Sequence, residues 1–309
     1  MTTTSWPPLW TLLAVAGLAG TLGTGPAMAQ SASSDDFRGV VELFTSQGCA
    51  SCPPADDVLA RLSDEHGIVA LSYNVDYWDY IGWKDQLATR QNTERQRSYA
   101  KAFRTSSVYT PQVVVNGTGD FIGSHDKEIS QALKSSPLAT GQDALARVAM
   151  NVVDETLQVR AKLVGPATEN PPILVLVTYQ DRIETPVLKG ENSGHHIVNR
   201  HAVSEFKVVG TVSETKPLEI DIPVSMLQEG ARGAIGCAVL LQAVDASGTA
   251  TDVADEDEPA AQDTDEPARS GDASTTDESG SSDRPAPGPR GRTPKAKRSS
   301  VPSWDDIVF

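Results

Sequence analysis

The sequence predicts an α/β domain over residues 37–136, then a β-rich, sandwich-like domain over residues 144–246, then a disordered tail over residues 250–309. Strand-like and helix-like patterns alternate in the first region, which favours a layered sheet with parallel strands. Apolar runs of strand length fill the second region, with no amphipathic helix between them. The tail consists mostly of Asp, Glu, Ser, Thr, Pro, Gly and Ala, which bury too little apolar surface to offset the entropy of ordering.

The first 29 residues are predicted to be a secretory signal. Residues 9–22 are apolar but short for a membrane-spanning helix, and Pro26-Ala27-Met28-Ala29 fits a cleavage site after Ala29. Residues 1–10 contain no Lys or Arg, so a retained membrane anchor is the alternative. We expect a secreted or periplasmic protein, without stable membrane insertion after cleavage, in a compartment where disulfides persist.

The charge and the cysteine content exclude two classes of protein. The formal net charge is −15, and binding phosphates needs clustered Lys and Arg, so we expect no nucleic acid partner. Three cysteines are too few for a disulfide-stapled scaffold.

The tail is acidic up to Asp283 and basic over residues 284–298. Its apolar end, residues 301–309, is either a docking peptide or a passive solvated end.

The first region alternates strands and helices. In order, the patterns predict a strand over Val40–Phe44, a helix over Ala55–His66, a strand over Ile68–Val75, a helix over Gln86–Phe103, a strand over Val108–Asn116, a short strand over Phe121–Gly123 and a helix over Lys127–Leu133. Asp126 is the expected N-cap of the last helix.

The second region is predicted to be an antiparallel sandwich. Its β-rich stretches are Ala144–Val164, Ile173–Asp181, Phe206–Val212, Leu218–Val224 and Ala234–Val244. Apolar residues alternate over residues 147–152 and 157–163 around Asp154-Glu155, which is typical of a hairpin. Cys237 lies in an apolar run, so we expect a buried, inert thiol; pairing with another chain is the alternative.

Cys49 and Cys52 lie between the first predicted strand and the first predicted helix. A thiol pair at this position can close a disulfide and open it again, because the helix N-terminus stabilises a thiolate. The first cysteine would attack and the second would resolve the mixed disulfide. No organic cofactor is required; the predicted partners are protein thiols or disulfides, or an electron-donor protein.

Two alternatives to redox chemistry remain open for this cysteine pair. One is an inert structural disulfide. The other is metal binding, for which no four-ligand zinc pattern is completed, although a soft metal such as Cu(I) suits two thiols. His195, His196 and His201 are expected in a loop of the β-rich region, away from the cysteines. The sequence predicts no metal site.

Tyr77, Trp78, Tyr80 and Trp83 crowd one short segment after the second predicted strand. They could wall a cleft beside the thiols and bind an extended peptide. The alternative is that they pack the loop against the following helix, since aromatic side chains mostly bury area.

The order of strand, Cys-x-x-Cys, helix and later Thr110-Pro111 before a strand resembles the thioredoxin-like fold. The resemblance implies a cis proline at Pro111 that faces the thiol pair and walls the substrate cleft. It also implies substrate contacts by Thr110 and, as proton acceptor, the buried acid of the first strand, which Glu42 matches if one extra residue is allowed before Cys49.

A second resemblance covers residues 39–245 and rests on several motifs in order. The sequence is similar to a secreted bacterial family named domain of unknown function 1223 in VELFTSQGCASCPPAD (41–56), VDYWDYIGWKD (75–85), SVYTPQ (107–112) and GENSG (190–194). This resemblance implies a thioredoxin-like domain with a β-rich appendage and no established reaction.

Two functional hypotheses follow from the sequence. The first is a thiol–disulfide oxidoreductase in which Cys49 attacks, Cys52 resolves, and Pro111, Thr110, Trp78 and Trp83 contact the substrate. The second is a non-catalytic binding protein whose disulfide stays closed, because fold does not imply function.

Overall fold

The structure of the chain, a computed structural model, describes residues 11–15, 30–138, 140, 144, 146–165, 170–213, 215–228 and 235–243. The predicted tail over residues 250–309 lies outside the described residues. So does the predicted signal, apart from residues 11–15.

Two 3₁₀ helices, four α-helices and twelve strands are described. The first half of the chain forms β1 (Thr11–Val15), β2 (Gln30–Ser33), η1 (Ser34–Asp36), β3 (Gly39–Thr45), α1 (Pro53–Ser63), β4 (Ile68–Asn74), η2 (Asp76–Ile81), α2 (Arg90–Ala102), β5 (Gln112–Val115), β6 (Gly119–Ile122) and α3 (Asp126–Ser135). The second half forms β7 (Ala146–Val153), β8 (Thr156–Leu163), β9 (Ile173–Pro186), β10 (His196–Thr211), β11 (Leu218–Pro223), α4 (Val224–Leu227) and β12 (Ile235–Gln242). None of these helices is both long enough and apolar enough to cross a bilayer.

The larger sheet has eight strands in the order β1-β12-β9-β10-β4-β3-β5-β6. β3 and β4 are parallel and are joined through α1. β5 is antiparallel to β3, and β6 is antiparallel to β5. Side chains alternate between the faces of a strand, so in β3 Val41 and Leu43 join one core cluster while Val40 and Phe44 join another.

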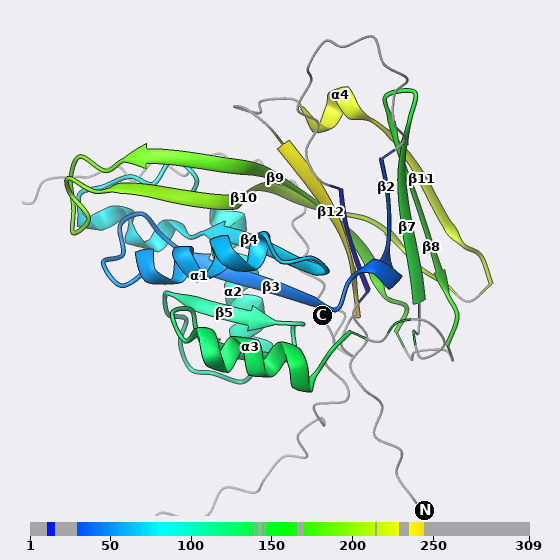
Figure 1. The fold of residues 1–309 in the computed structure, drawn as a ribbon, viewed down its shortest axis with the longest axis horizontal. Coiled ribbons are helices and arrows are strands. Elements are labelled where there is room, and N and C mark those ends of the chain that lie inside the picture. Colours follow the sequence, from blue (N-terminus) through cyan, green and yellow to red (C-terminus); the bar gives the residue numbers. More distant parts are fainter. Residues whose placement is uncertain are drawn as a thin grey trace, which may run out of the picture. The chain divides into compact units, whose positions relative to one another are not determined.

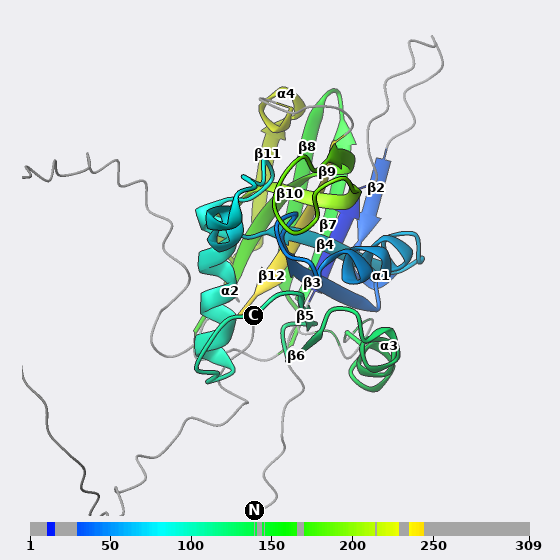
Figure 2. The ribbon, with the colours of Figure 1, turned by 90° about the vertical axis from the view of Figure 1, so that its left-hand side faces the viewer.

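Helices cover both faces of this sheet. α1 and α3 lie on one face and α2 lies on the other (Figure 2). The first face buries Val58, Leu59 and Leu62 of α1 together with Ile129 and Leu133 of α3. Because β3 is buried on both faces, its sequence Val-Val-Glu-Leu-Phe is almost continuously apolar.

The smaller sheet has four strands in the order β11-β8-β7-β2. Its β7–β8 hairpin turns at Asp154 and Glu155, both with positive φ (48° and 59°), as two-residue hairpin turns require. Its apolar face shares a core cluster with β9 and β12 of the larger sheet, and the two sheets form a sandwich (Figure 1). The predicted hairpin and the β-rich character of this region are confirmed.

β9 and β10 form a long antiparallel hairpin that links the two predicted regions in one sheet. Its register runs from Ile173 opposite Thr211 to Pro186 opposite His196. β10 also pairs in parallel with β4 at Ala202 and Ser72, and His201 Nδ1 lies 2.8 Å from the Ala70 carbonyl oxygen of β4. The far end of the hairpin extends beyond the sandwich, toward the start of α1 (Figure 1).

Three local predictions differ from the structure. Residues 196–205 are strand rather than loop, so His196 and His201 lie on β10. The N-cap of α3 is His125, and the Asp126 carboxylate pairs with Arg61 instead. β1 and β2 were not predicted; β1 pairs with β12, although it falls within the predicted signal.

Candidate functional site

The Cys49–Cys52 disulfide closes the loop between β3 and α1, with Cα atoms 5.4 Å apart. Pro53 and Pro54 occupy the first turn of α1, where a missing N–H costs no helical hydrogen bond. Cys52 is the N-cap residue, and its carbonyl accepts from the Ala55 and Asp56 N–H groups at 2.8 and 3.1 Å. The helix therefore begins directly after the second cysteine, and the positive end of its dipole lies at the cysteine pair.

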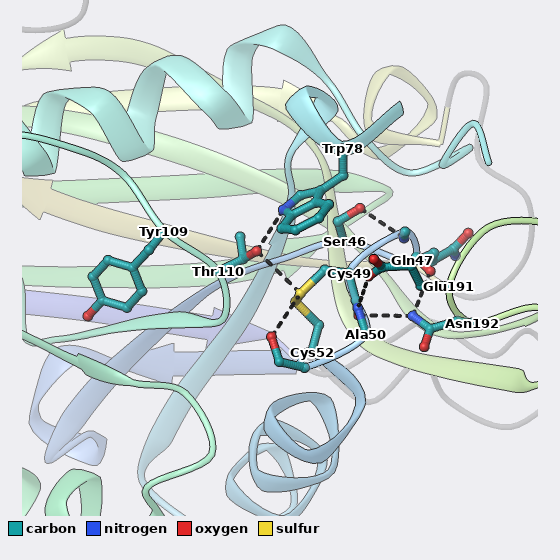
Figure 3. Close-up of a disulfide and its surroundings, with 12 residues drawn as sticks. Ser46, Gln47, Cys49, Ala50, Cys52, Trp78, Tyr109, Thr110, Glu191 and Asn192 are labelled. Carbon is teal, nitrogen blue, oxygen red and sulfur yellow. Dashed lines mark hydrogen bonds between the residues drawn. A yellow bond between two sulfur atoms is a disulfide. The ribbon is translucent and has the colours of Figure 1, made fainter. Parts of the chain in front are cut away.

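Both cysteine side chains are fully buried, at 0% exposure each. Ala50 and Ser51 between them are exposed. The two residues between the cysteines thus lie at the surface, while Cys49 and Cys52 lie beside side chains from other segments, such as Thr110 and Trp78 (Figure 3).

Thr110 and Trp78 cover the Cys49 sulfur from one side. The Thr110 hydroxyl donates to Cys49 Sγ at 3.3 Å and accepts from Trp78 Nε1 at 2.7 Å. The peptide bond between Thr110 and Pro111 is cis, and Pro111 is buried at the start of β5. The structure thus brings together Cys49, Thr110, Pro111 and Trp78, all of which the sequence analysis selected.

The loop over residues 187–195, at the far end of the β9–β10 hairpin, covers the disulfide from the other side. Asn192 is buried, and its side-chain amide donates to the carbonyl oxygens of Gln47 and Cys49, both at 2.9 Å. The Ala50 N–H donates to Glu191 Oε2 at 3.3 Å. We name residues 187–195 the covering loop.

Gln47 anchors the cysteine loop to the surrounding elements. Its backbone N–H donates to Asp85 Oδ2 at 2.9 Å, and its side-chain amide donates to Thr185 and Asn199 of the β9–β10 hairpin. Trp83 Nε1 donates to Gln47 Oε1 at 3.1 Å. Trp83 therefore contacts the cysteine loop at Gln47, two residues before Cys49.

Glu42 does not join this group. Its side chain faces α2, where Arg95 donates to both carboxylate oxygens at 2.6 and 3.0 Å and the Tyr99 hydroxyl donates to one of them. Both charged side chains are buried, and the Arg95 guanidinium lies over the rings of Tyr73 and Phe206. This arrangement is a buried ion pair in the core.

A second buried acid lies on the disulfide side of the sheet. Asp56 is 5% exposed and follows Cys52 by one helical turn, and neither of its carboxylate oxygens has a hydrogen-bond partner among the described residues. Burial raises the pKa of Asp56 well above its usual value; Asp85 and Asp57 act in the same direction, whereas Thr45 lowers it.

The remaining predicted residues have different positions. Tyr77 and Trp78 are partly buried against the core, whereas Tyr80 is 82% exposed. Cys237 is a free, buried thiol, and burial raises its pKa to about 12. Among the described residues, no group of three or more His, Cys, Asp or Glu side chains is arranged to hold a metal ion.

Gln47, Asn192 and Asp85 carry no role in the predictions made from the sequence. Gln47 and Asn192 belong to motifs that carried the family resemblance, which was the available signal. The two carbonyl groups to which Asn192 donates lie more than 140 residues away along the chain. A local sequence pattern therefore does not reveal this contact.

Comparison with known proteins identifies relatives without a stated activity. Residues 40–242 match the family described as protein of unknown function DUF1223. The crystal structure of protein AGR_C_4864 from Agrobacterium tumefaciens is 35% identical, covers 68% of this chain and 88% of its own, and has a TM-score of 0.57. HBP35 of Porphyromonas gingivalis is 12% identical over 66% of this chain and 69% of its own, with a TM-score of 0.40. No curated protein matches.

Proposed function

Because the chain belongs to the DUF1223 family, whose description assigns no reaction, we propose a function from the geometry of the site. The protein carries out thiol–disulfide exchange through Cys49 and Cys52 on a thioredoxin-like scaffold. Its partner is a protein dithiol or disulfide in an oxidising compartment outside the cytoplasm, which the predicted signal over residues 1–29 supports.

The strand order supports this scaffold. β3, α1 and β4 form a parallel crossover, β5 and β6 add antiparallel strands beside β3, and α3 follows. The disulfide lies at the start of α1, and cis-Pro111 lies at the start of β5 beside it.

The observation that carries the proposal is the contact between Thr110 Oγ1 and Cys49 Sγ at 3.3 Å. A hydroxyl that donates to sulfur stabilises a thiolate more than a thiol. The same hydroxyl lies beside cis-Pro111, in a segment whose backbone can align a partner peptide against Cys49. A structural disulfide needs neither feature.

The reaction transfers two electrons. A partner thiolate attacks Cys49 Sγ, a partner–Cys49 disulfide forms, and the Cys49–Cys52 bond breaks with its electron pair on Cys52 Sγ. A second partner thiolate then attacks the partner's own sulfur and releases Cys49. The partner leaves as a disulfide, and the protein is left with two thiols.

Trapping tests this proposal directly. The variant Cys52→Ala probes the reverse direction, in which the Cys49 thiolate attacks a partner disulfide and Cys52 resolves the mixed disulfide. Without Cys52 that resolution is lost, so Cys49 should retain partner proteins that appear on a non-reducing gel and disappear on reduction. Cys49→Ala is the matched control and should retain none. A potential of the Cys49–Cys52 pair below about −300 mV, together with no trapped partner, would contradict the proposal.

A second candidate is a binding protein with a permanently closed disulfide. The favouring observation is the complete burial of both sulfur atoms, together with the hydrogen bonds that Asn192 makes to the loop. In that case native protein should resist dithiothreitol at concentrations that reduce it after unfolding in urea. Reduction of the native protein within minutes would reject this candidate.

A further inference from the structure

We propose that Asp56 gives a proton to the Cys52 sulfur when the disulfide opens and takes it back when the disulfide closes. The inference deepens the exchange reaction proposed above and rests on it. It assigns a role to a residue that the thiol chemistry leaves unexplained.

The backbone of α1 places the two groups one turn apart. The Asp56 N–H donates to the Cys52 carbonyl at 3.1 Å, and side chains four residues apart lie on the same helix face. Both side chains are buried. The carboxyl group and the leaving sulfur therefore lie beneath the same surface, and Asp57, the next residue, is exposed.

Burial outweighs the two features that favour a negative charge on Asp56, its position in the first turn of α1 and the nearby Thr45. No described basic side chain pairs with it, and neither of its oxygens has a hydrogen-bond partner. A buried acid without such partners stays protonated, because burial disfavours its charged form. Asp56 therefore holds a proton one helical turn after Cys52.

The groups that face Asp56 come from three segments. Thr45, at the end of β3, lowers the Asp56 pKa, although its hydroxyl makes no hydrogen bond of ordinary geometry. Asp85, from the segment after η2, and Asp57, from α1 itself, raise the pKa. Burial raises the pKa of Asp85 itself, whereas the hydrogen bonds that it accepts from Gln47 and Asn74 lower it.

The proton balances the exchange step. When a partner thiolate attacks Cys49, the electron pair of the broken bond remains on Cys52 Sγ, which is buried at the helix start. The Asp56 carboxyl transfers its proton to that sulfur and becomes a carboxylate. In the reverse direction the carboxylate takes the proton from the Cys52 thiol as the thiol attacks the mixed disulfide.

The test measures reduction of the oxidised full chain by dithiothreitol from pH 5 to pH 9. Each sample is quenched with acid and alkylated, and the reduced fraction is read by mass. The rate is divided by the dithiothreitol thiolate concentration, so that only the protein contributes to the pH profile. Asp56→Asn keeps the shape and removes the proton donor, and Asp57→Asn is the matched control. Asp56→Ser is a second variant in case the first folds poorly.

We expect the wild-type rate per thiolate to be high at low pH and to fall as Asp56 deprotonates. Asp56→Asn should be about tenfold slower at pH 5, since proton transfer by a positioned group contributes that much or more, and its profile should be flat. Asp57→Asn should keep the wild-type rate at pH 5, with its midpoint at a somewhat lower pH, because the Asp57 charge raises the Asp56 pKa.

Two results would overturn the inference, and they are distinguishable. If the wild type is reduced readily and Asp56→Asn and Asp56→Ser match it at every pH, Asp56 is not the donor while the exchange function stands. If the native wild type is not reduced at any pH, the exchange function fails and the role of Asp56 fails with it.

Discussion

The Cys49 sulfur is held by a hydroxyl whose orientation is set by a neighbouring ring. Trp78 Nε1 donates to Thr110 Oγ1, and Thr110 Oγ1 donates to Cys49 Sγ. The indole occupies one lone pair of the hydroxyl oxygen, so the hydroxyl proton is directed at the sulfur. Trp78 is therefore a positioning residue for Thr110, and the aromatic segment contributes more than buried area.

Replacing Thr110 by Val removes this hydroxyl and keeps the side-chain shape. A hydrogen bond worth about 1 kcal/mol to the thiolate changes its population by about fivefold. Alkylation of Cys49 by iodoacetamide at pH 7 in the reduced protein should therefore slow by about that factor, as followed by mass. Thr110→Ser should restore the rate. Equal rates in Thr110→Val and the wild type would show that the hydroxyl does not act on the sulfur.

Asp56 also predicts how stability depends on pH. Its pKa is raised in the folded state by burial, so between the unfolded and folded pKa values the folded chain binds more protons. Stability that depends on this proton is fully present below the unfolded pKa, near 3.9, and is lost as pH rises through the folded pKa. Urea unfolding of the oxidised chain from pH 4 to pH 8 should show the wild type losing stability relative to Asp56→Asn. A constant difference across this range would contradict the assignment.

At the scale of elements, the covering loop closes the site because the β9–β10 hairpin extends far enough to reach the start of α1. Gln47 bonds to Thr185 and Asn199 on the hairpin, and Arg200 pairs with Asp64 at the end of α1 at 3.1 Å. The hairpin is therefore attached to the α/β part of the sheet at several points, and the covering loop is held against the backbone of the cysteine loop.

Asn192→Ala should make the disulfide easier to reduce. The substitution removes two hydrogen bonds to the cysteine loop, and a loss of about 1.4 kcal/mol in the closed state raises an opening equilibrium about tenfold. The rate of reduction by dithiothreitol at pH 7 should rise by about this factor. Ser193→Ala is the control, since the Ser193 hydroxyl donates to the Leu188 carbonyl within the covering loop. Unchanged reduction in Asn192→Ala would mean that opening does not pass through this loop.

Glu42→Gln should cost stability without affecting exchange. The change leaves the Arg95 charge buried and uncompensated, and breaking a buried pair in this way typically costs about 3–5 kcal/mol. Urea unfolding checks the loss. The rate of disulfide reduction per folded molecule should equal that of the wild type, and a large fall would instead support the proton-acceptor role that the sequence resemblance implies. Glu42→Leu with Arg95→Met is the control that removes both charges.

Local sequence patterns predicted the strands and helices whose apolar residues are continuous or periodic. They did not predict the segments whose structure depends on contacts with residues distant in the sequence. β3, β4 and the face of α1 have apolar sequences because both sides of the sheet are covered. Residues 196–205 contain His196 and Arg200, which pair with Pro186 and Arg182 of β9. They also contain His201, whose Nδ1 lies 2.8 Å from the Ala70 carbonyl oxygen of β4. Cys49, Thr110 and Trp78 were found from short motifs, whereas Asn192 required knowledge of how the hairpin lies.

At the scale of the whole molecule, the two predicted regions share a hydrophobic core. One core cluster contains Phe44, Tyr73 and Tyr99 from the first region together with Tyr179 and Phe206 from the second. Gln91 of α2 donates to the Phe206 carbonyl at 2.9 Å. The sheet, the core and the covering loop of the disulfide are thus all built from both regions.

This shared core predicts that residues 37–136 do not fold alone. The fragment would expose the core side chains that now pack against β9, β10 and β12, and each large apolar side chain left in water costs roughly 1.5–3 kcal/mol. We expect a fragment of residues 30–140 to bind a hydrophobic dye and to lack a cooperative unfolding transition. The chain of residues 30–249 should unfold in one transition that near-ultraviolet circular dichroism and tryptophan fluorescence report at the same urea concentration. Two separated transitions, or a fragment with a native-like spectrum, would show that the regions are independent domains and that the second region contributes only the covering loop.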